Sequence, residues 1–88
     1  MKLTAEMRRK APRRLFAMPL LKKYYLGDCR HVGSAVKRFR ENKRRYPKQL
    51  RTQAANVITE SWLKCHAPDL SPRERKSLVP RVRKALHI

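Results

Sequence analysis

Acidic residues are scarce in this sequence. Its 88 residues include six Asp and Glu against 24 Lys and Arg, which gives a formal net charge of +18. The acids stand singly along the chain, so no carboxylate pair for general acid–base catalysis is indicated. So many like charges on a small protein repel one another, and a polyanionic partner relieves that repulsion. The composition therefore predicts a large anionic molecule that contacts the protein on several sides.

Glycine is also rare, with two residues in the chain. A Gly-rich loop that cradles phosphate is not indicated, and no Ser or Cys lies in a motif that marks a nucleophile. The histidines His31, His66 and His87 fall in predicted loops or near the end of the sequence. We therefore expect no catalytic residue, no cofactor and no enzyme activity.

Long apolar runs are missing too. The longest, around residues 15–21, is interrupted by Pro19 and is shorter than the ~18–20 residues that cross a bilayer. The basic start is not followed by the apolar segment and cleavage site of a secretory signal. We expect a protein that does not span a membrane, with a basic N-terminal arm at residues 1–14 and one small domain at residues 15–88.

Cysteine occurs only at Cys29 and Cys65. Two cysteines are too few for a disulfide-stapled secreted scaffold and suit a reducing compartment, so we expect Cys65 to be a small buried hydrophobic residue. A Cys29–Cys65 disulfide is a weaker alternative. A zinc site that adds His31 and His66 is weaker still, because paired zinc ligands normally lie about two to five residues apart.

Helical periodicity is the main structural signal. The sequence predicts an all-α fold of three to four short helices at residues 19–26, 34–46, 48–65 and 72–87. Helix 48–65 is expected to be central, because its middle part carries little charge. Its predicted apolar face consists of Leu50, Ala54, Val57, Ile58, Ser61 and Cys65, with Ala55 and Trp62 beside them.

Capping residues set the boundaries of the two preceding helices. Pro19 suits the first turn of helix 19–26, and Gly27 suits its C-terminal cap. Ser34 is the expected N-cap of helix 34–46, after a loop at residues 28–33. The predicted apolar side of helix 34–46 consists of Val32, Ala35, Val36, Phe39 and Tyr46.

Helix 72–87 has the clearest start signal in the sequence. Ser71, Pro72 and Glu74 match a capping box with proline at the first helical position. Pro80 removes one backbone hydrogen bond, so we expect a kink near it. The arm 1–14 is expected to be extended or partly helical. It is interpreted as an import presequence, a nucleic-acid-binding arm or a solvated basic tail.

Basic residues concentrate in the arm and in helices 34–46 and 72–87. Within residues 37–45, six cations accompany one anion, which exceeds what solubility requires and favours contact with phosphates. The predicted RNA-binding residues are Arg8, Arg9, Lys10, Arg13, Arg14, Lys22, Lys23, Lys37, Arg38, Arg40, Lys43, Arg44, Arg45, Arg73, Arg75, Lys76, Arg81, Arg83 and Lys84.

Two groups of uncharged residues are also considered for contact with a partner. Tyr24 and Tyr25 are expected to dock on the core, with stacking on nucleic-acid bases as the alternative. The polar edge of helix 48–65 is expected to form hydrogen bonds with RNA or with a neighbouring protein. This edge consists of Thr52, Gln53, Asn56 and Thr59.

Small, basic, helical chains are typical of ribosomal proteins, a likeness of composition and size alone. We therefore expect a structural rRNA-binding protein of a ribosome, with ribosomal RNA and neighbouring ribosomal proteins as partners. The basic, acid-poor start favours a mitochondrial ribosome over a cytoplasmic one. The alternatives are an accessory subunit or assembly factor of a mitochondrial complex, and a DNA-packaging protein.

Overall fold

Helices make up most of the structure, as the sequence predicts. The computed structural model describes residues 4–88. In chain order its elements are α1 (Ala5–Lys10), the 3-10 helix η1 (Arg13–Leu15), the strands β1 (Phe16–Met18) and β2 (Lys23–Tyr25), α2 (Cys29–Asn42), the 3-10 helix η2 (Lys43–Arg45), α3 (Lys48–His66) and α4 (Pro72–Ala85).

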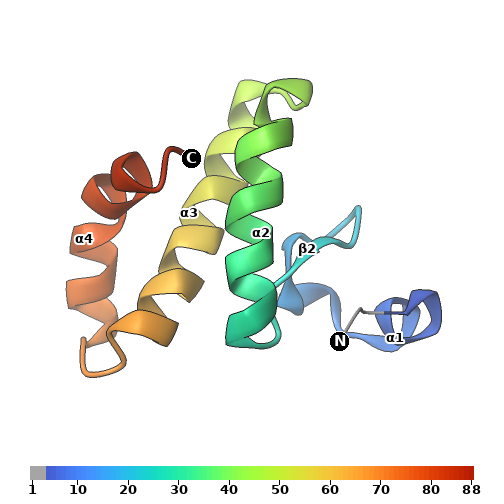
Figure 1. Cartoon of the computed structure of the whole chain (residues 1–88), viewed down its shortest axis with the longest axis horizontal. Coiled ribbons are helices and arrows are strands. Elements are labelled where there is room, and N and C mark those ends of the chain that lie inside the picture. Colours follow the sequence, from blue (N-terminus) through green and yellow to red (C-terminus); the bar gives the residue numbers. More distant parts are fainter. Residues whose placement is uncertain (1–3) are drawn as a thin grey trace.

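The long helix α3 lies at the centre of the arrangement (Figure 1). It packs against α2 on one side and α4 on the other, and it also contacts β1. The hairpin of β1 and β2 covers α2, and α1 lies at the outer end beyond the hairpin. The predicted central role of residues 48–65 is therefore confirmed.

The buried surface of α3 is wider than predicted. Ala54 and Ile58 are buried as expected, but Ala55 and Thr59 are fully buried as well, and Val57 is 41% exposed. The prediction of Val57 as a core residue is wrong, because the contacts of α3 with α2, α4 and β1 leave this side chain exposed. A narrow apolar stripe identifies one contact face of a helix and misses a second one.

Helix α2 begins earlier than predicted. Asp28 is its N-cap, and the Asp28 Oδ1 atom accepts a hydrogen bond of 2.8 Å from the His31 backbone N–H. The predicted loop at residues 28–33 is therefore wrong, and Ser34 lies inside the helix. Asp is as good an N-cap as Ser, and the cost of about 1 kcal/mol for Gly33 within the helix is small enough for packing to offset. The predicted apolar side is confirmed for Val32, Ala35, Val36 and Phe39, which are buried.

The segment predicted as helix 19–26 is a β-hairpin instead. β1 and β2 pair antiparallel, with Met18 opposite Lys23. The turn between them is closed by a hydrogen bond of 3.2 Å from the Leu21 N–H to the Met18 carbonyl. Pro19 therefore occupies the second position of a β-turn, which its fixed φ favours as much as it favours the first turn of a helix. The prediction is wrong because it considered only the helical use of this proline.

The capping box of α4 is confirmed. The Glu74 N–H donates to Ser71 Oγ (3.2 Å), and the Ser71 N–H donates to Glu74 Oε1 (3.0 Å). The helix continues through Pro80 to Ala85, so the proline does not break it. After the helix, Ile88 packs into the core.

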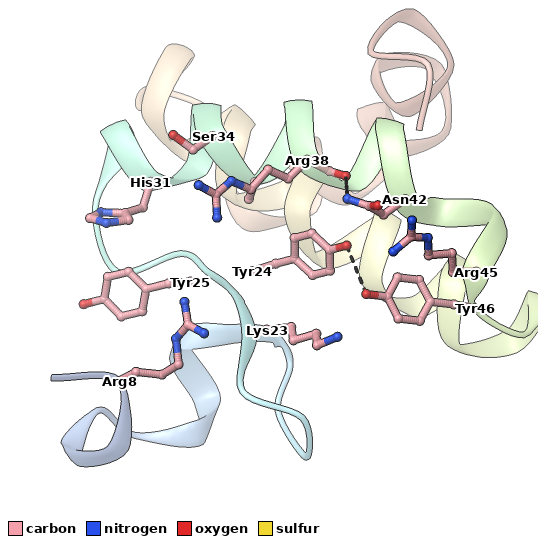
Figure 2. A pocket seen from close by; sticks show the side chains of 11 residues that line it. Arg8, Lys23, Tyr24, Tyr25, His31, Ser34, Arg38, Asn42, Arg45 and Tyr46 are labelled. Atoms are coloured by element: carbon pink, nitrogen blue, oxygen red, sulfur yellow. Dashed lines mark hydrogen bonds between the residues drawn. The ribbon is translucent and has the colours of Figure 1, made fainter. Parts of the chain in front are cut away.

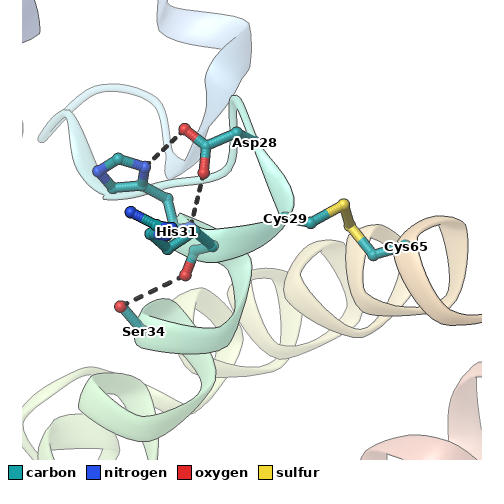
Figure 3. A network of polar contacts seen from close by, with 6 residues as sticks. Asp28, Cys29, His31, Ser34 and Cys65 are labelled. Carbon is teal, nitrogen blue, oxygen red and sulfur yellow. Dashed lines mark hydrogen bonds and ion pairs between the residues drawn. A yellow bond between two sulfur atoms is a disulfide. The ribbon is translucent and has the colours of Figure 1, made fainter. Parts of the chain in front are cut away.

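Cys29 and Cys65 form a disulfide, which contradicts the expectation of a free buried Cys65 (Figure 3). Their Cα atoms are 5.7 Å apart, and the bond joins the first turn of α2 to the last turn of α3. The earlier start of α2 accounts for this, because it brings Cys29 onto the helix that packs beside α3. The expectation of a reducing compartment depended on free cysteines, and the disulfide removes that support.

Candidate nucleic-acid interface

Most of the predicted RNA-binding cations are exposed. Lys22, Lys43, Arg75 and Arg83 are half-buried, and none of the predicted cations is buried. The exposed ones are Arg8, Arg9, Lys10, Arg13, Arg14, Lys23, Lys37, Arg38, Arg40, Arg44, Arg45, Arg73, Lys76, Arg81 and Lys84.

Carboxylates neutralise almost none of this charge. Within residues 4–88, the only ion pair between a Lys or Arg and a carboxylate joins Lys10 Nζ to Glu6 Oε1 at 3.1 Å. Both side chains are well exposed, and such a pair contributes little because water screens it. In the described part of the chain, ion pairs with carboxylates therefore leave nearly all the Lys and Arg charges unneutralised.

Two of the predicted RNA-binding cations connect the residues that follow α4 to α2 and η2. Arg40 donates to the Leu86 carbonyl oxygen from Nε (3.1 Å) and from Nη2 (2.9 Å). Lys43 Nζ donates to the His87 carbonyl oxygen at 3.1 Å. Cations at this position interact favourably with the unpaired carbonyls at a helix C-terminus. Arg40 and Lys43 thus have a structural role in addition to any contact with a partner.

Three further cations bond within the protein. Lys22 Nζ donates to the Arg9 carbonyl oxygen at 2.7 Å and so connects the hairpin to the end of α1. The other such bonds run from Arg75 Nη1 to the Leu70 carbonyl oxygen (3.0 Å) and from Arg83 Nη1 to Asn56 Oδ1 (3.1 Å). The sequence indicates the charge of these residues but not the oxygen atoms to which they bond.

A groove of about 580 Å³ lies between α2 and the hairpin (Figure 2). Its first wall is one face of α2, continued by η2. Apart from the adjacent pair Ser34 and Ala35, the lining residues of this wall are three or four positions apart, which places them on one side of the helix. They are His31, Ser34, Ala35, Arg38, Asn42 and Arg45. The sequence predicts RNA binding for Arg38 and Arg45 but not for the polar residues His31, Ser34 and Asn42 of the same wall.

The second wall comes from the hairpin and α1. It consists of Lys23, Tyr24 and Tyr25 from β2 and Arg8 from α1, and Tyr46, which directly follows η2, faces Tyr24. We call this recess the tyrosine groove. Four cations and three tyrosines line it, and no carboxylate does. Figure 2 shows the guanidinium groups of Arg8 and Arg38 reaching toward the space between the two walls.

Tyr24 and Tyr46 form one end of the tyrosine groove. Their hydroxyl oxygens are 3.2 Å apart, and their rings meet edge to face. Burial and this hydrogen bond raise the pKa of Tyr24 above its ordinary value of 10.0. Tyr24 also packs edge-on against Phe39, and Lys23 Nζ lies 5.8 Å from the Tyr46 ring centroid. Tyr24 therefore docks on the core, as the sequence predicts.

Tyr25 and His31 form the other end. The centroids of their rings are 5.0 Å apart and the rings are nearly perpendicular. Asp28 holds the imidazole, because its Oδ2 atom lies 2.7 Å from His31 Nδ1 (Figure 3). Hydrogen bonds from the backbone N–H and the side chain of His31 lower the pKa of the Asp28 carboxyl.

A second, smaller basic recess of about 370 Å³ lies between η2, α3, the end of α4 and Ile88. Its charged lining residues are Lys43, Arg44, Arg51 and Arg83. Arg51 was not among the predicted RNA-binding residues, although its spacing from Arg44 across the Tyr46–Pro47 corner was visible in the sequence. Lys43 and Arg83 already bond to protein oxygens there.

The polar edge predicted on α3 is only partly available to a partner. Gln53 and Asn56 are exposed and Thr52 is half-buried. Thr59 is fully buried, and its Oγ1 donates to the Ala55 carbonyl oxygen at 2.7 Å. The prediction that Thr59 forms a hydrogen bond to RNA or to a neighbouring protein is therefore wrong, because the packing of α3 covers it.

The residues considered for zinc do not come together as ligands. Cys29 and Cys65 are bonded to each other. His31 lies against Asp28, whereas His66 stacks on Trp62 with ring centroids 4.1 Å apart. Among the described residues, no group of three His, Cys, Asp or Glu is placed to hold a metal ion.

Comparisons of the chain with models of protein families, with curated protein sequences and with solved structures found no match. In the part of the chain that the structure describes, no helix combines the length and apolar character needed to cross a membrane. The functional argument therefore depends on the surface itself.

Proposed function

We propose that this protein is a structural RNA-binding component of a ribosome. The observation that carries the proposal is the large excess of exposed Lys and Arg residues that have no carboxylate partner in residues 4–88. These residues lie on α1, α2 and α4, which are spread across the molecule (Figure 1). A partner that contacts the protein from several sides, as folded ribosomal RNA does, would neutralise them together.

The mechanism is the replacement of counterions. Each Lys or Arg that contacts a phosphate releases a condensed cation from the RNA, and the gain in entropy drives binding. Such contacts carry no sequence information. The protein is thus expected to bridge and stabilise folded RNA without reading base identity from the phosphate contacts.

The mitochondrial location is part of the same proposal. The support for it is the basic, acid-poor start of the chain, of which residues 5–10 form the helix α1 with a single acid, Glu6. A cytoplasmic ribosome is the alternative. Fractionation of cells that express the tagged full chain distinguishes the two, and recovery of the protein with cytoplasmic ribosomes would contradict the mitochondrial location.

The test of the ribosomal proposal is co-sedimentation. The tagged protein is expected to migrate with a ribosomal subunit through a sucrose gradient, and treatment of the lysate with RNase is expected to release it. Migration that is independent of RNA, or release by DNase alone, would contradict the proposal. The second outcome is the one expected of a DNA-packaging protein.

One observation favours a second candidate function, an accessory subunit of a protein complex. Leu20 and Leu21 at the tip of the hairpin are 84% and 53% exposed. Adjacent exposed leucines fit a surface that contacts another protein better than a surface that contacts RNA phosphates. This candidate predicts co-sedimentation with a large complex that survives RNase. It also predicts that replacing both leucines with Ser abolishes co-sedimentation.

A further inference from the structure

The tyrosine groove combines two features that neutralisation of an RNA surface does not require. Its cations project from two facing walls, and three tyrosines line the same recess. None of Arg8, Lys23, Arg38 and Arg45 donates a side-chain hydrogen bond to another residue within residues 4–88. Within the described residues, no carboxylate or hydrogen-bond acceptor therefore competes with an anion for these four charges.

The ring of Tyr25 is held in place by two aromatic neighbours, neither of which stacks parallel to it. Its contacts with Phe16 and His31 are both edge-to-face, with ring centroids 5.5 and 5.0 Å apart. Among the described residues no ring lies parallel to it. A flat π-surface fixed in this way next to cations has the arrangement on which single-stranded nucleic acids stack their bases.

Gly27 contributes to the position of Tyr25. A Cβ atom at Gly27 would overlap the hydroxyl and ring of Tyr25. The glycine is required for this close approach rather than for an unusual backbone angle, because its φ is not positive. Any larger residue would displace the ring from its present place in the groove.

We propose that the tyrosine groove binds a single-stranded segment of RNA, with an unpaired base on Tyr25 and phosphates on Arg8, Arg38 and Arg45. This inference rests on the proposed function, because it takes RNA as the polyanion. It extends that function by separating one site for unpaired RNA from the remaining basic surface, which binds paired and unpaired RNA alike.

The chemistry of the groove favours a single strand over a duplex. In a duplex, each base is covered by its neighbours in the stack, so only an unpaired base can lie against an aromatic side chain. A volume of about 580 Å³ is within the range of about 300–1,000 Å³ that is typical of pockets for small organic ligands, and so it is large enough for a nucleotide. An anion without a base would use the cations alone.

The test compares three fluorescently labelled probes with equal charge: a short oligouridine, a blunt RNA duplex and poly-glutamate. Replacing Tyr25 with Leu is expected to weaken oligouridine binding about tenfold, which is what losing one stacked base typically costs. Binding of the duplex and of poly-glutamate should change less than twofold. Y25F keeps the ring and should bind all three probes like the wild type.

A second variant tests the position of the ring at constant charge. G27A keeps Tyr25 and every cation but displaces the ring, so it should reproduce the selective loss seen with Tyr25→Leu. Circular dichroism is used to verify that each variant is folded. If either folded variant binds oligouridine as the wild type does, or loses affinity equally for all three probes, the groove does not recognise unpaired bases.

Charge in the groove is tested with a matched pair of arginines. R38A removes a cation from the groove, whereas R81A removes an exposed cation from α4 that lies outside it. The proposal predicts that R38A weakens oligouridine binding several times more than R81A. Equal losses would contradict it.

The failure of this inference is distinguishable from the failure of the proposed function. If the wild-type protein binds neither RNA probe, the ribosomal proposal is wrong. A different outcome is that the wild type binds both RNA probes while Tyr25→Leu and G27A show no selective loss of oligouridine affinity relative to the duplex. In that case the ribosomal proposal stands and the groove proposal is wrong.

Discussion

At the residue scale, burial decides which polar side chains are available to a partner. Long cationic side chains keep their charges in water, and so their exposure is predictable from the sequence alone. The exposure of a threonine is harder to predict, because its hydroxyl can form a hydrogen bond with the backbone of its own helix and so be buried. Thr59 illustrates this difference: it was assigned to a partner-facing edge, and the structure buries it completely.

Thr59 gives the first prediction. T59V keeps the buried shape and removes only the Oγ1 bond to the Ala55 carbonyl, so the free energy of unfolding should change by less than about 1 kcal/mol. RNA affinity should stay unchanged, because the hydroxyl does not reach the surface. Urea unfolding and RNA titration measure the two effects. A several-fold loss of RNA affinity at unchanged stability would show that Thr59 is exposed in solution.

Asp28 gives a prediction on pH. Its pKa is lowered from the ordinary 3.8 in the folded state by the His31 backbone N–H and then by the His31 side chain. The unfolded chain therefore binds this proton more tightly, so the stabilisation is complete well above pH 3.8 and is lost as the pH falls through the lowered folded pKa. Because the carboxylate is exposed, the effect is small.

The measurement compares the melting temperatures of the wild type and D28N. Asn is an equally good N-cap, so the comparison isolates the charge of Asp28. The advantage of the wild type at neutral pH should shrink steadily once the pH falls below 3.8. An advantage that is constant down to the lowest pH would show that the charge contributes nothing.

At the element scale, the structure separates strong local signals from ambiguous ones. The Ser71 capping box predicts the start of α4 correctly, because only a helix N-terminus uses both of its hydrogen bonds. Pro19 suits a β-turn and a helix start equally, and only the pairing of β1 with β2 decides between them. Pairing depends on contacts between segments, which local sequence does not encode.

The same distinction between local signals and contacts between segments applies to the candidate site. The sequence shows that residues 37–45 are rich in cations, and the structure confirms that Lys37, Arg38 and Arg44 are exposed. The tyrosine groove was not predictable, because its second wall depends on the hairpin, which was predicted to be a helix. The disulfide was missed for a related reason, since Cys29 was assigned to a loop.

The disulfide gives a prediction at this scale. Cys29 and Cys65 are 36 residues apart, and a cross-link over that separation stabilises the folded state by about 3–4 kcal/mol through the lost entropy of the unfolded chain. Reduction should therefore lower the melting temperature by more than about 10 °C. Thermal unfolding with and without a phosphine reductant measures this shift.

A double variant supplies the control for reduction. Replacing Cys29 and Cys65 with Ser should give the melting temperature of the reduced wild type, and the reductant should not change it further. If reduction leaves the melting temperature of the wild type unchanged, the two sulfur atoms are not bonded in solution.

At the scale of the whole molecule, small size and large charge act together. A chain of this length buries only about 60–65% of its unfolded surface, and a charge of +18 opposes compaction further. Three features of the structure offset this cost: the disulfide, the core around Phe39 and Ile58, and the bonds from Arg40 and Lys43 to the end of α4. Bound RNA would add to them by neutralising the surface.

Arg44 provides a prediction about how binding is distributed over the surface. It is exposed, and it lines the smaller recess rather than the tyrosine groove. R44A should weaken binding to all RNA sequences equally and reduce the slope of log affinity against log salt by roughly one unit. RNA titrations at several salt concentrations with unrelated sequences measure this. A loss restricted to one sequence would show that Arg44 reads a base.

The salt dependence of RNA binding by the wild-type protein tests the central claim most directly. If the protein neutralises about 6–10 phosphates, its affinity for RNA should fall by about 10³–10⁵ between about 50 and 200 mM salt. Fluorescence anisotropy with a labelled RNA fragment across that range gives the slope. A linear, steep fall is the result that we predict, and an affinity independent of salt would contradict the assignment of this basic surface to RNA.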